Sequence, residues 1–485
     1  MLIKKTSLFI IPFLVMTSGC FNSANKKMAS TLTSPTLTGS LHKVESSHLF
    51  APLDLENSWW SAFQDTQLSN LIELALQSSP TLQKAEAKVL AAQANAKSIR
   101  SSLFPHLDAG AENTWQYLSK YGLLRDFYPI LPGAPDPCKY NETNLSLDFS
   151  YELDFWGKNR QMLQAALGLT LADEMEKVEA TLILSTTIAF TYYTWQAHFA
   201  ELILYQRQLT FEDDLLALLE ARYQIGIDKI VPSLERKEKR LSLLQKIEDL
   251  EKDLSIDETF LKNLLGQGPD YPLNLVFSWN PSEQRGYLPD TLEIDLLSQR
   301  PDIRAQIFRV ESARQEIGVA KTEFYPNVNL MALGGLSSLS LSHLFDWKSR
   351  TGNIHPAIHL PLFTAGKLQA NLLGKVAEFN EAVYSYNELL LKAAKEVTSE
   401  ITTFISFHTQ IEDQRKKTKL QQELLTVAFS CFTQGIDPYS NVLISKEELL
   451  LREIYEVQLQ QSKILSSIRI IKAIGGGVSK KGELQ

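Results

Sequence analysis

The sequence predicts an α+β membrane protein that is internally duplicated, with four transmembrane β-strands per chain leading into long helices. Three observations support this fold class. Some segments alternate strictly between apolar and polar residues, as strands with one wet face do. Two segments keep helical periodicity over 66 residues each, and the whole succession of segments occurs twice in 485 residues. At about 1.5 Å per residue such a helix is roughly 100 Å long, which no compact globule needs.

The first nineteen residues have the layout of a secretory signal peptide. Two lysines precede an apolar run at Leu8–Val15, which is too short to span a bilayer as a helix. A Thr-Ser-Gly sequence then precedes Cys20, as at the lipidation site of bacterial lipoproteins, although leucine is usual in place of Thr17. We expect lipidation of Cys20; the alternative is an ordinary signal peptide with an incidental cysteine. Residues 20–58 lack periodicity and predict a lipid-anchored, extended tether.

Charge, cysteines and motifs exclude several classes of function. The formal net charge of −8, with few basic clusters, gives no support for nucleic-acid binding. Cys138 and Cys431 lie in segments of different kinds, so the cysteines form no disulfide framework. His355 and His359 fall in a predicted strand, where four residues separate them by about 13 Å, too far to share a metal ion. Because no catalytic motif is present, we expect no enzyme activity and no cofactor.

Two registers of self-similarity define the duplication. In the first, 221 residues separate the matching prolines, Pro80 with Pro301 and Pro105 with Pro326. In the second, 209 residues separate the matching glycines, Gly157 with Gly366, Gly226 with Gly435 and Gly266 with Gly475. The difference between the two separations reflects a longer connection between Pro105 and Gly157 in the first copy. We therefore divide the chain into a first repeat at 59–270, a second at 271–477 and a C-terminal tail at 478–485.

Each repeat is predicted to run helix, strand, loop, strand, long helix, turn, helix. In the first repeat we expect helix 66–103 interrupted at Pro80, a hairpin within 104–156 pairing 106–117 with 145–155, and helices 158–223 and 229–265. In the second we expect helix 302–324, a hairpin within 325–364 pairing 327–336 with 354–363, and helices 367–432 and 439–474.

The segment Leu145–Phe155 illustrates the strand pattern. Its odd positions are apolar or aromatic and its even positions are Ser, Asp or Glu. Eleven residues suffice for a tilted strand to cross a bilayer, with apolar side chains outward and polar ones in a wet lumen. A strand of a soluble sheet would show the same alternation. In the membrane interpretation the lumen is lined by acids: Asp108, Glu112, Asp148, Glu152 and Asp154. Such acids would either favour the passage of cationic solutes or only keep the lumen hydrated.

Four strands cannot close a barrel, and an open sheet edge cannot face lipid because its backbone groups would lack hydrogen bonds. Membrane-spanning strands must therefore be pooled among copies of the chain. Two copies supply eight strands and three supply twelve. Eight strands nearly fill their own interior with side chains, so a transport lumen favours twelve or more. This reasoning excludes a membrane-embedded monomer and leaves the number of copies open.

The longest motifs resemble those of the outer membrane efflux proteins, the TolC-like family, and most closely its lipoprotein branch of the OprM or NodT type. The matching segments are Trp59-Trp60, SYELDFWGKNR from Ser150, QRPDIRAQIFRVESARQEIGVAKTEFYPNVNL from Gln299, LPLFTAGKLQANL from Leu360 and RIIKAIGGG from Arg469. They cover the chain from about Trp59 to Gly477. One departure is Val478, where the family often has an aromatic residue.

The resemblance implies a homotrimer, with a 12-stranded barrel in the outer membrane that continues into a 12-helix tube across the periplasm. It further implies docking to a periplasmic adaptor protein of an RND-type inner-membrane pump, and passive conduction of small molecules. Within this fold, an exit duct for metal ions or secreted polypeptide is an alternative. A lipid-anchored coiled-coil scaffold that does not conduct is an alternative of another class.

The resemblance also points to the turns between the long helices, which narrow the periplasmic mouth in this family through an RYxxGxxD motif. The first repeat has the motif intact, with an acid further on: Arg222, Tyr223, Gly226, Asp228 and Glu235. The corresponding positions of the second repeat are Cys431, Phe432, Gly435, Asp437 and Ile444. An ionic gate is therefore doubtful there, and apolar contact of Phe432 and Ile444 would replace it. Alternatively, the glycines and aspartates simply shape the turns.

Overall fold

The computed structural model describes residues 49–52, 58–117, 119, 139–279, 286–288 and 298–476. These residues form two compact units. The first comprises Ala91–Leu171 and Phe308–Ser385, and the second comprises the other described residues. The predicted signal peptide, Cys20 and the C-terminal tail lie outside the described residues, so they stay predictions.

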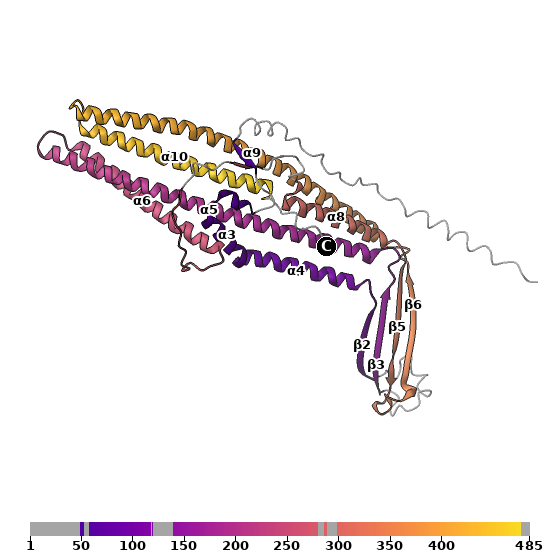
Figure 1. Cartoon of the computed structure of the whole chain (residues 1–485). Coiled ribbons are helices and arrows are strands. Elements are labelled where there is room, and N and C mark those ends of the chain that lie inside the picture. Colours follow the sequence, from indigo (N-terminus) through magenta and orange to yellow (C-terminus); the bar gives the residue numbers. More distant parts are fainter. Residues whose placement is uncertain are drawn as a thin grey trace, which may run out of the picture. The chain divides into compact units, whose positions relative to one another are not determined.

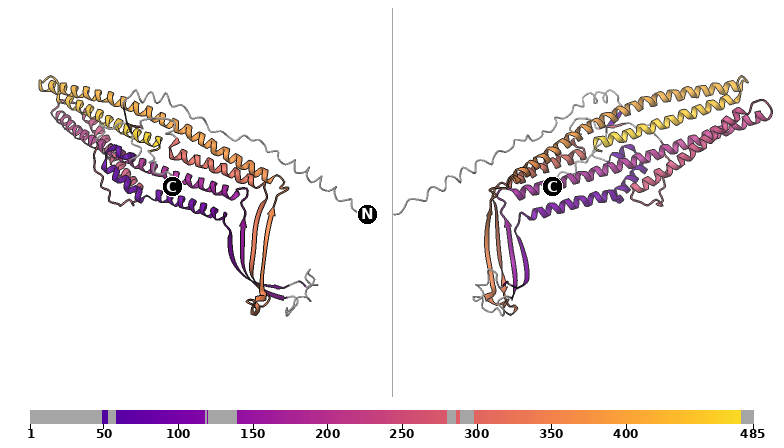
Figure 2. Two further views of the ribbon diagram at one scale, coloured as in Figure 1. Left: turned by 45° about the vertical axis from the view of Figure 1, so that its right-hand side comes forward. Right: turned by 180° about the vertical axis from the view of Figure 1, so that it is seen from behind.

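A four-stranded antiparallel sheet dominates the first unit (Figure 1). Its strands are β2 (His106–Tyr117), β3 (Lys139–Glu152), β5 (Asn327–Ser338) and β6 (Arg350–His359), in the order β2-β3-β5-β6. The β3–β5 pairing joins the hairpin of the first repeat to that of the second. The four strands lie side by side in both views of Figure 2. Within the described chain, β2 and β6 each have one edge without a strand partner.

The strand register confirms the predicted alternation. Asp108 lies opposite Asp148, and Asp148 lies opposite Leu333 of β5, so even positions of β2 and β3 share a face with odd positions of β5 and β6. The strand limits differ from the prediction. β3 begins at Lys139 instead of 145 and ends at Glu152 instead of 155. β6 spans Arg350–His359 instead of 354–363, because its pairing with β5 begins four residues earlier than the apolar pattern indicates.

Helix ends adjoin the sheet in the first unit. α4 (Pro80–Ser101) and α8 (Pro301–Thr322) precede the hairpins, while α5 (Lys158–Gln224) and α9 (Lys367–Thr433) follow them. Gly168 of α5 lies against α8, where an added Cβ would be 3.2 Å from the Ser312 Cβ. The Ser312 hydroxyl donates a hydrogen bond to the Ala165 carbonyl at 2.9 Å. The glycine in α5 therefore permits close packing of the two helices, and the helix continues through it.

The second unit contains most of the helical residues. Besides parts of α5, α8 and α9 it holds η2 (Trp59–Phe63), α3 (Thr66–Ser78), α6 (Val231–Leu264) and α10 (Tyr439–Ile474). The predicted limits 439–474 of the last helix are confirmed, and those of the other long helices differ by one or two residues. A short parallel pair, β1 (Phe50–Pro52) with β4 (Gly286–Leu288), was not predicted.

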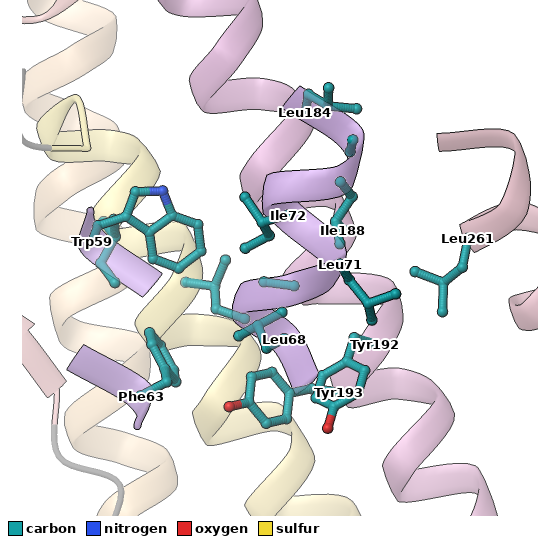
Figure 3. Close-up of a cluster of buried hydrophobic side chains, with 14 of the residues drawn as sticks. Trp59, Phe63, Leu68, Leu71, Ile72, Leu184, Ile188, Tyr192, Tyr193 and Leu261 are labelled. Atoms are coloured by element: carbon teal, nitrogen blue, oxygen red, sulfur yellow. The ribbon is translucent and has the colours of Figure 1, made fainter. Parts of the chain in front are cut away.

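Figure 3 shows the largest core cluster of the second unit, where η2 and α3 pack on α5. Asp65 caps α3 by accepting a hydrogen bond from the Leu68 amide at 3.0 Å, and it also accepts one from the Tyr192 hydroxyl at 2.9 Å. Burial, together with the Asp65 carboxylate, raises the pKa of Tyr192. The labelled side chains of this core are Trp59, Phe63, Leu68, Leu71, Ile72, Leu184, Ile188, Tyr192, Tyr193 and Leu261.

The two halves of the chain match closely in element length. α4 and α8 have 22 residues each, β2 and β5 have 12 each, and α5 and α9 have 67 each. Proline begins both α4 and α8, where its missing amide hydrogen costs nothing. The duplication that the prolines and glycines indicate is thus repeated in the order and length of the elements.

Candidate functional site

One face of the four-stranded sheet, here called the polar face, carries all the acidic side chains of its strands. Its carboxylates are Asp108, Glu112, Glu142, Asp148 and Glu152. Among the described residues of this face there is no lysine or arginine. Glu142 was missed by the sequence prediction, because the polar stretch before Leu145 shows no alternation. The polar face therefore has negative charge without neighbouring Lys or Arg on the strands themselves.

Asp108 and Asp148 lie directly opposite each other on neighbouring strands. The Ser146 hydroxyl donates a hydrogen bond to Asp148 Oδ2 at 2.6 Å. The Thr114 hydroxyl similarly donates to Glu112 Oε1 at 3.1 Å. Like charges on a cross-strand pair repel, and nothing in the fold requires both to be acidic. The pair therefore does not contribute to the stability of the sheet.

The structure corrects the prediction for Asp154, which lies beyond the end of β3 and caps α5. Its carboxylate accepts hydrogen bonds from the Asn159 and Arg160 amides at 3.3 and 3.1 Å, and from Arg160 Nε at 3.1 Å. The first amides of a helix lack partners, so this carboxylate satisfies them. Glu152, at the end of the strand, forms an ion pair with Lys158 at 3.2 Å. The other predicted lumen acids, Asp108, Glu112 and Asp148, lie on the polar face and have no cationic partner among the residues that the structure describes.

The opposite face of the sheet, here called the apolar face, exposes large hydrophobic side chains. Ile354, Ile358 and Leu107 are 76, 74 and 66% exposed. Leu147 and Phe149 alternate with the acids of β3 on this face. An exposed apolar surface of this extent is unfavourable in water and requires a covering partner.

The first helix turn is closed by an ion pair within the motif. Gly226 has φ +77°, and its amide donates to the Tyr223 carbonyl at 2.9 Å. Arg222 binds Asp228 with two bonds, Nε to Oδ2 at 2.6 Å and Nη2 to Oδ1 at 3.1 Å. The hydrogen bond from Arg222 holds the pKa of Asp228 below its usual value. Glu235, the acid that follows, is exposed and forms no ion pair within the described chain.

The second helix turn has the same backbone and different side-chain contacts. Gly435 has φ +72°, and its amide donates to the Phe432 carbonyl at 2.9 Å. Cys431 replaces the arginine, and Asp437 forms no ion pair within the described part of the chain. Instead, the Phe432 ring packs on Tyr439, with ring centroids 5.0 Å apart. The two turns therefore share a fold and differ in chemistry.

Ile444 is 41% exposed, in the α10 turns that follow this second bend. The structure pairs Phe432 with Tyr439, and the ring of Tyr439 was not singled out from the sequence. The signal was available, since an aromatic residue seven positions after Phe432 begins the next helix.

An ion-pair network that the sequence did not reveal joins α5, α6 and α10. Arg236 Nη1 of α6 lies 3.3 Å from Glu212 Oε2 of α5 and 2.8 Å from Glu447 Oε2 of α10. Lys239 also pairs with Glu447. The two carboxylate side chains are only 2 and 9% exposed. The network thus connects helices of the first repeat to a helix of the second.

The described residues include no helix that is both long enough and apolar enough to cross a membrane. In the same residues, no three His, Cys, Asp or Glu side chains gather in an arrangement that could hold a metal ion.

Comparison with known proteins places the chain in a family. The family model described as "Outer membrane efflux protein" matches residues 71–267 and 294–476. The multidrug resistance outer membrane protein MdtQ of Escherichia coli strain CFT073 is 30% identical over 431 residues, which cover 88% of this chain and 89% of MdtQ. The multidrug resistance outer membrane protein MdtP of Escherichia coli K12 is 27% identical over 420 residues, 86% of each chain.

Solved structures show the same fold. The outer membrane protein VceC of Vibrio cholerae is 31% identical, with a TM-score of 0.75 over 86% of this chain and 98% of VceC. The outer-membrane channel OprN is 21% identical, with a TM-score of 0.81 over 93% of this chain and 98% of OprN. Because the family model covers most of the chain and a relative at 30% identity spans nearly all of it, the chain belongs to the outer membrane efflux protein family.

Proposed function

We propose that the protein is the outer membrane channel of a tripartite efflux system, conducting small molecules passively from the periplasm to the exterior. The observation that carries this proposal is the separation of charge between the two faces of the sheet. Carboxylates occupy the polar face, whereas Leu107, Ile354 and Ile358 are exposed on the apolar face. A wall between lipid and water requires this separation.

The unpaired edges of β2 and β6 support an assembly of several copies, which we propose to be a homotrimer. Backbone groups at a sheet edge cannot remain unpaired in hydrocarbon, so each copy must pair its β2 with the β6 of a neighbour. Three copies close a barrel of twelve strands, which is wide enough for a lumen. The long helices of three copies supply the periplasmic tube, and a lipid on Cys20 would add a second attachment to the outer membrane.

Aromatic side chains at both ends of the sheet support its membrane span. Trp115 and Tyr117 are 74 and 61% exposed on the apolar face at the loop end. At the helix end, Trp156 stacks on Tyr325 with ring centroids 4.8 Å apart and donates to the Pro326 carbonyl at 2.8 Å. Aromatic residues of membrane barrels concentrate at the two interfaces with water.

The names of MdtQ and MdtP suggest drugs as substrates, and the polar face favours those with positive charge. The energy would come from an RND-type inner-membrane pump, reached through a periplasmic adaptor that contacts the helix turns. We assign the closing ring to Arg222, Tyr223 and Glu235 of the first turn together with Phe432 and Ile444 of the second, while Gly226, Asp228, Gly435 and Asp437 shape the turns.

The test is single-channel conductance of the purified protein in planar bilayers, with its oligomeric mass determined in the same detergent. Discrete conductance steps from a trimer support the proposal. A monomer without conductance refutes it and favours a lipid-anchored scaffold. A stable trimer that conducts only after adaptor is added supports a channel with a closed resting state.

A further inference from the structure

The loop between β5 and β6 is a folded structure built on its own contacts. It contains two short 3₁₀ helices, η5 (Leu341–His343) and η6 (Trp347–Ser349). Leu344 between them is only 4% exposed. The Ser349 hydroxyl donates to the His343 carbonyl at 2.6 Å, and the Ser340 amide donates to the Ser338 hydroxyl at 3.1 Å. The loop therefore presents its other side chains in fixed positions.

Three of those side chains are large, apolar and largely exposed to solvent. Leu341, Phe345 and Trp347 are 62, 79 and 77% exposed, although Leu344 shows that the loop can bury a side chain. Leaving such residues in water forgoes the favourable free energy of burying their apolar surface. Exposure at this level in a folded loop indicates an apolar or interfacial environment around it.

Cations accompany the exposed aromatic residues. The Arg350 guanidinium lies over the Trp347 indole, and its Nε donates to the Trp347 carbonyl at 2.8 Å. Arg350 lies opposite Leu336 at the loop end of β6 and shares the apolar face with Ile354. Lys348, within η6, is also exposed. The single carboxylate of the loop, Asp346, is held by His343 Nδ1 at 2.8 Å, so it does not compete for these cations.

The charges on the described strand residues of the apolar face are also positive. Its described strand residues carry only two charges, Lys139 and Arg350, and both are cations near the ends remote from the helices. All five carboxylates lie on the other face. A ligand bound outside the sheet at this end meets aromatic rings and positive charge together. Guanidinium groups bind phosphate through paired, charge-assisted hydrogen bonds.

We propose that Lys348 and Arg350, with Phe345 and Trp347 beside them, bind the phosphate groups of a phosphorylated glycolipid in the outer leaflet. This inference rests on the proposed function, in which the sheet spans the outer membrane. The helices adjoin one end of the hairpins, so the β5–β6 loop lies at the end facing the exterior. Phe345 and Trp347 enter the interface between headgroups and acyl chains, while the cations meet the phosphates.

The experiment titrates the purified full-length trimer with bisphosphorylated lipid A and follows binding by native mass spectrometry. The variant K348Q/R350Q removes both cations. We expect its affinity for lipid A to fall about tenfold, since charge-assisted bonds are lost. K321Q/K367Q is the matched control, because it removes two exposed cations at the helix end of the same hairpins; its affinity should stay within about twofold.

Two further measurements keep the inference falsifiable. R350K retains the charge and should recover part of the affinity, which a merely misfolded loop would not permit. Phosphatidylglycerol should bind more weakly than lipid A and should lose less affinity in K348Q/R350Q. Equal affinity of wild type and K348Q/R350Q for lipid A, or equal losses for the two lipids, overturns the inference. Trimer formation and conductance in the same samples test the proposed function separately.

Discussion

Arg236 Nη1 lies 2.8 Å from Glu447 Oε2, so a helix of the first repeat is tied to a helix of the second through a nearly buried carboxylate. Glu212 completes the arrangement from α5. Burial and the neighbouring Arg236 lower the pKa of Lys239, the second cation of the network. Arg236 is thus the cation that contacts both nearly buried carboxylates.

Replacing Arg236 by Gln should therefore destabilise the helical unit. Removing one partner of a buried ion pair leaves an uncompensated charge and costs about 3 kcal/mol. The melting temperature of the detergent-solubilised protein measures the effect. K237Q is the matched control, because Lys237 pairs with Glu220 at 2.7 Å where both side chains are about half exposed; its cost should be below about 1 kcal/mol. Similar melting temperatures for the two variants would refute the role of Arg236.

Substitution of Gly335 should disrupt the junction between the two hairpins. A Cβ at Gly335 would collide with the Leu145 carbonyl oxygen of β3, whereas one at Gly334 meets nothing within 4 Å. G335A should therefore cost about 2 kcal/mol through forced backbone shifts, and G334A should be tolerated. The yield of folded protein in outer-membrane fractions and its melting temperature report both outcomes. Equal yields would show that β3 and β5 separate without cost.

Neutralising the acids of the polar face should reduce selectivity for cations. The triple variant D108N/E112Q/D148N removes three negative charges per chain, and the ratio of cation to anion permeability should fall toward about 1. Reversal potentials under a salt gradient measure this ratio. D108E/E112D/D148E keeps the charges at the same positions and should leave the ratio unchanged. A ratio unaffected by neutralisation would mean that these acids only keep the surface hydrated.

Cys431→Arg should restore an ion pair in the second helix turn. The backbone there matches that of the first turn, where Arg222 binds Asp228 with two bonds, and Asp437 occupies the equivalent acidic position. We expect the amides of Ile436 and Asp437 to exchange hydrogen a few-fold more slowly, because opening of the turn must break the new pair. The channel should also open less often. C431R/D437N lacks the acceptor and should behave as wild type does.

The His198–Asp257 pair should make stability depend on pH. The hydrogen bond that His198 Nδ1 donates to the Asp257 carboxylate, at 2.8 Å, raises the pKa of His198 above 6.5. A group whose pKa is raised on folding stabilises the fold fully below its unfolded pKa, and this contribution is lost as pH rises through the folded pKa. Melting temperature should thus fall from about pH 6.5 upward, and D257N should flatten the profile.

His408 provides the opposite case for comparison. Burial, followed by the charges of Lys463 and Arg415, lowers the pKa of His408. Its protonation therefore opposes folding at acid pH, and H408Q should raise the melting temperature below about pH 6 while D257N should not. Parallel profiles for the two variants would contradict both assignments.

Much of the fold could be predicted because local sequence signals mark where each element begins and ends. The limits 439–474 of α10 follow from Gly435 and Gly475, both of which adopt positive φ. The limits of the strands were harder to predict from the sequence. Polar residues 139–144 extend β3 only because β2 offers them partners, and the alternation continues past Glu152 to Asp154 although pairing has stopped.

Contacts between distant helices could not be predicted at all. The pairing of Arg236 with Glu447 joins residues 211 positions apart, and neither residue belongs to a motif. Acidic residues of the polar face were found where the alternation is strict, and Glu142 was missed where it is not. Local periodicity shows which side of an element is wet, whereas the identity of its neighbour depends on packing of the whole chain.

The strand count has a consequence for assembly. The order β2-β3-β5-β6 contains an even number of antiparallel strands, so the two free edges run in opposite directions. A copy can therefore join edge to edge with an identical copy without inversion, and the hydrogen-bond geometry is equally satisfied in a ring of two, three or four. The strands alone therefore do not determine the number of copies. The curvature of the sheet and the helices that adjoin it must determine at which number the ring closes.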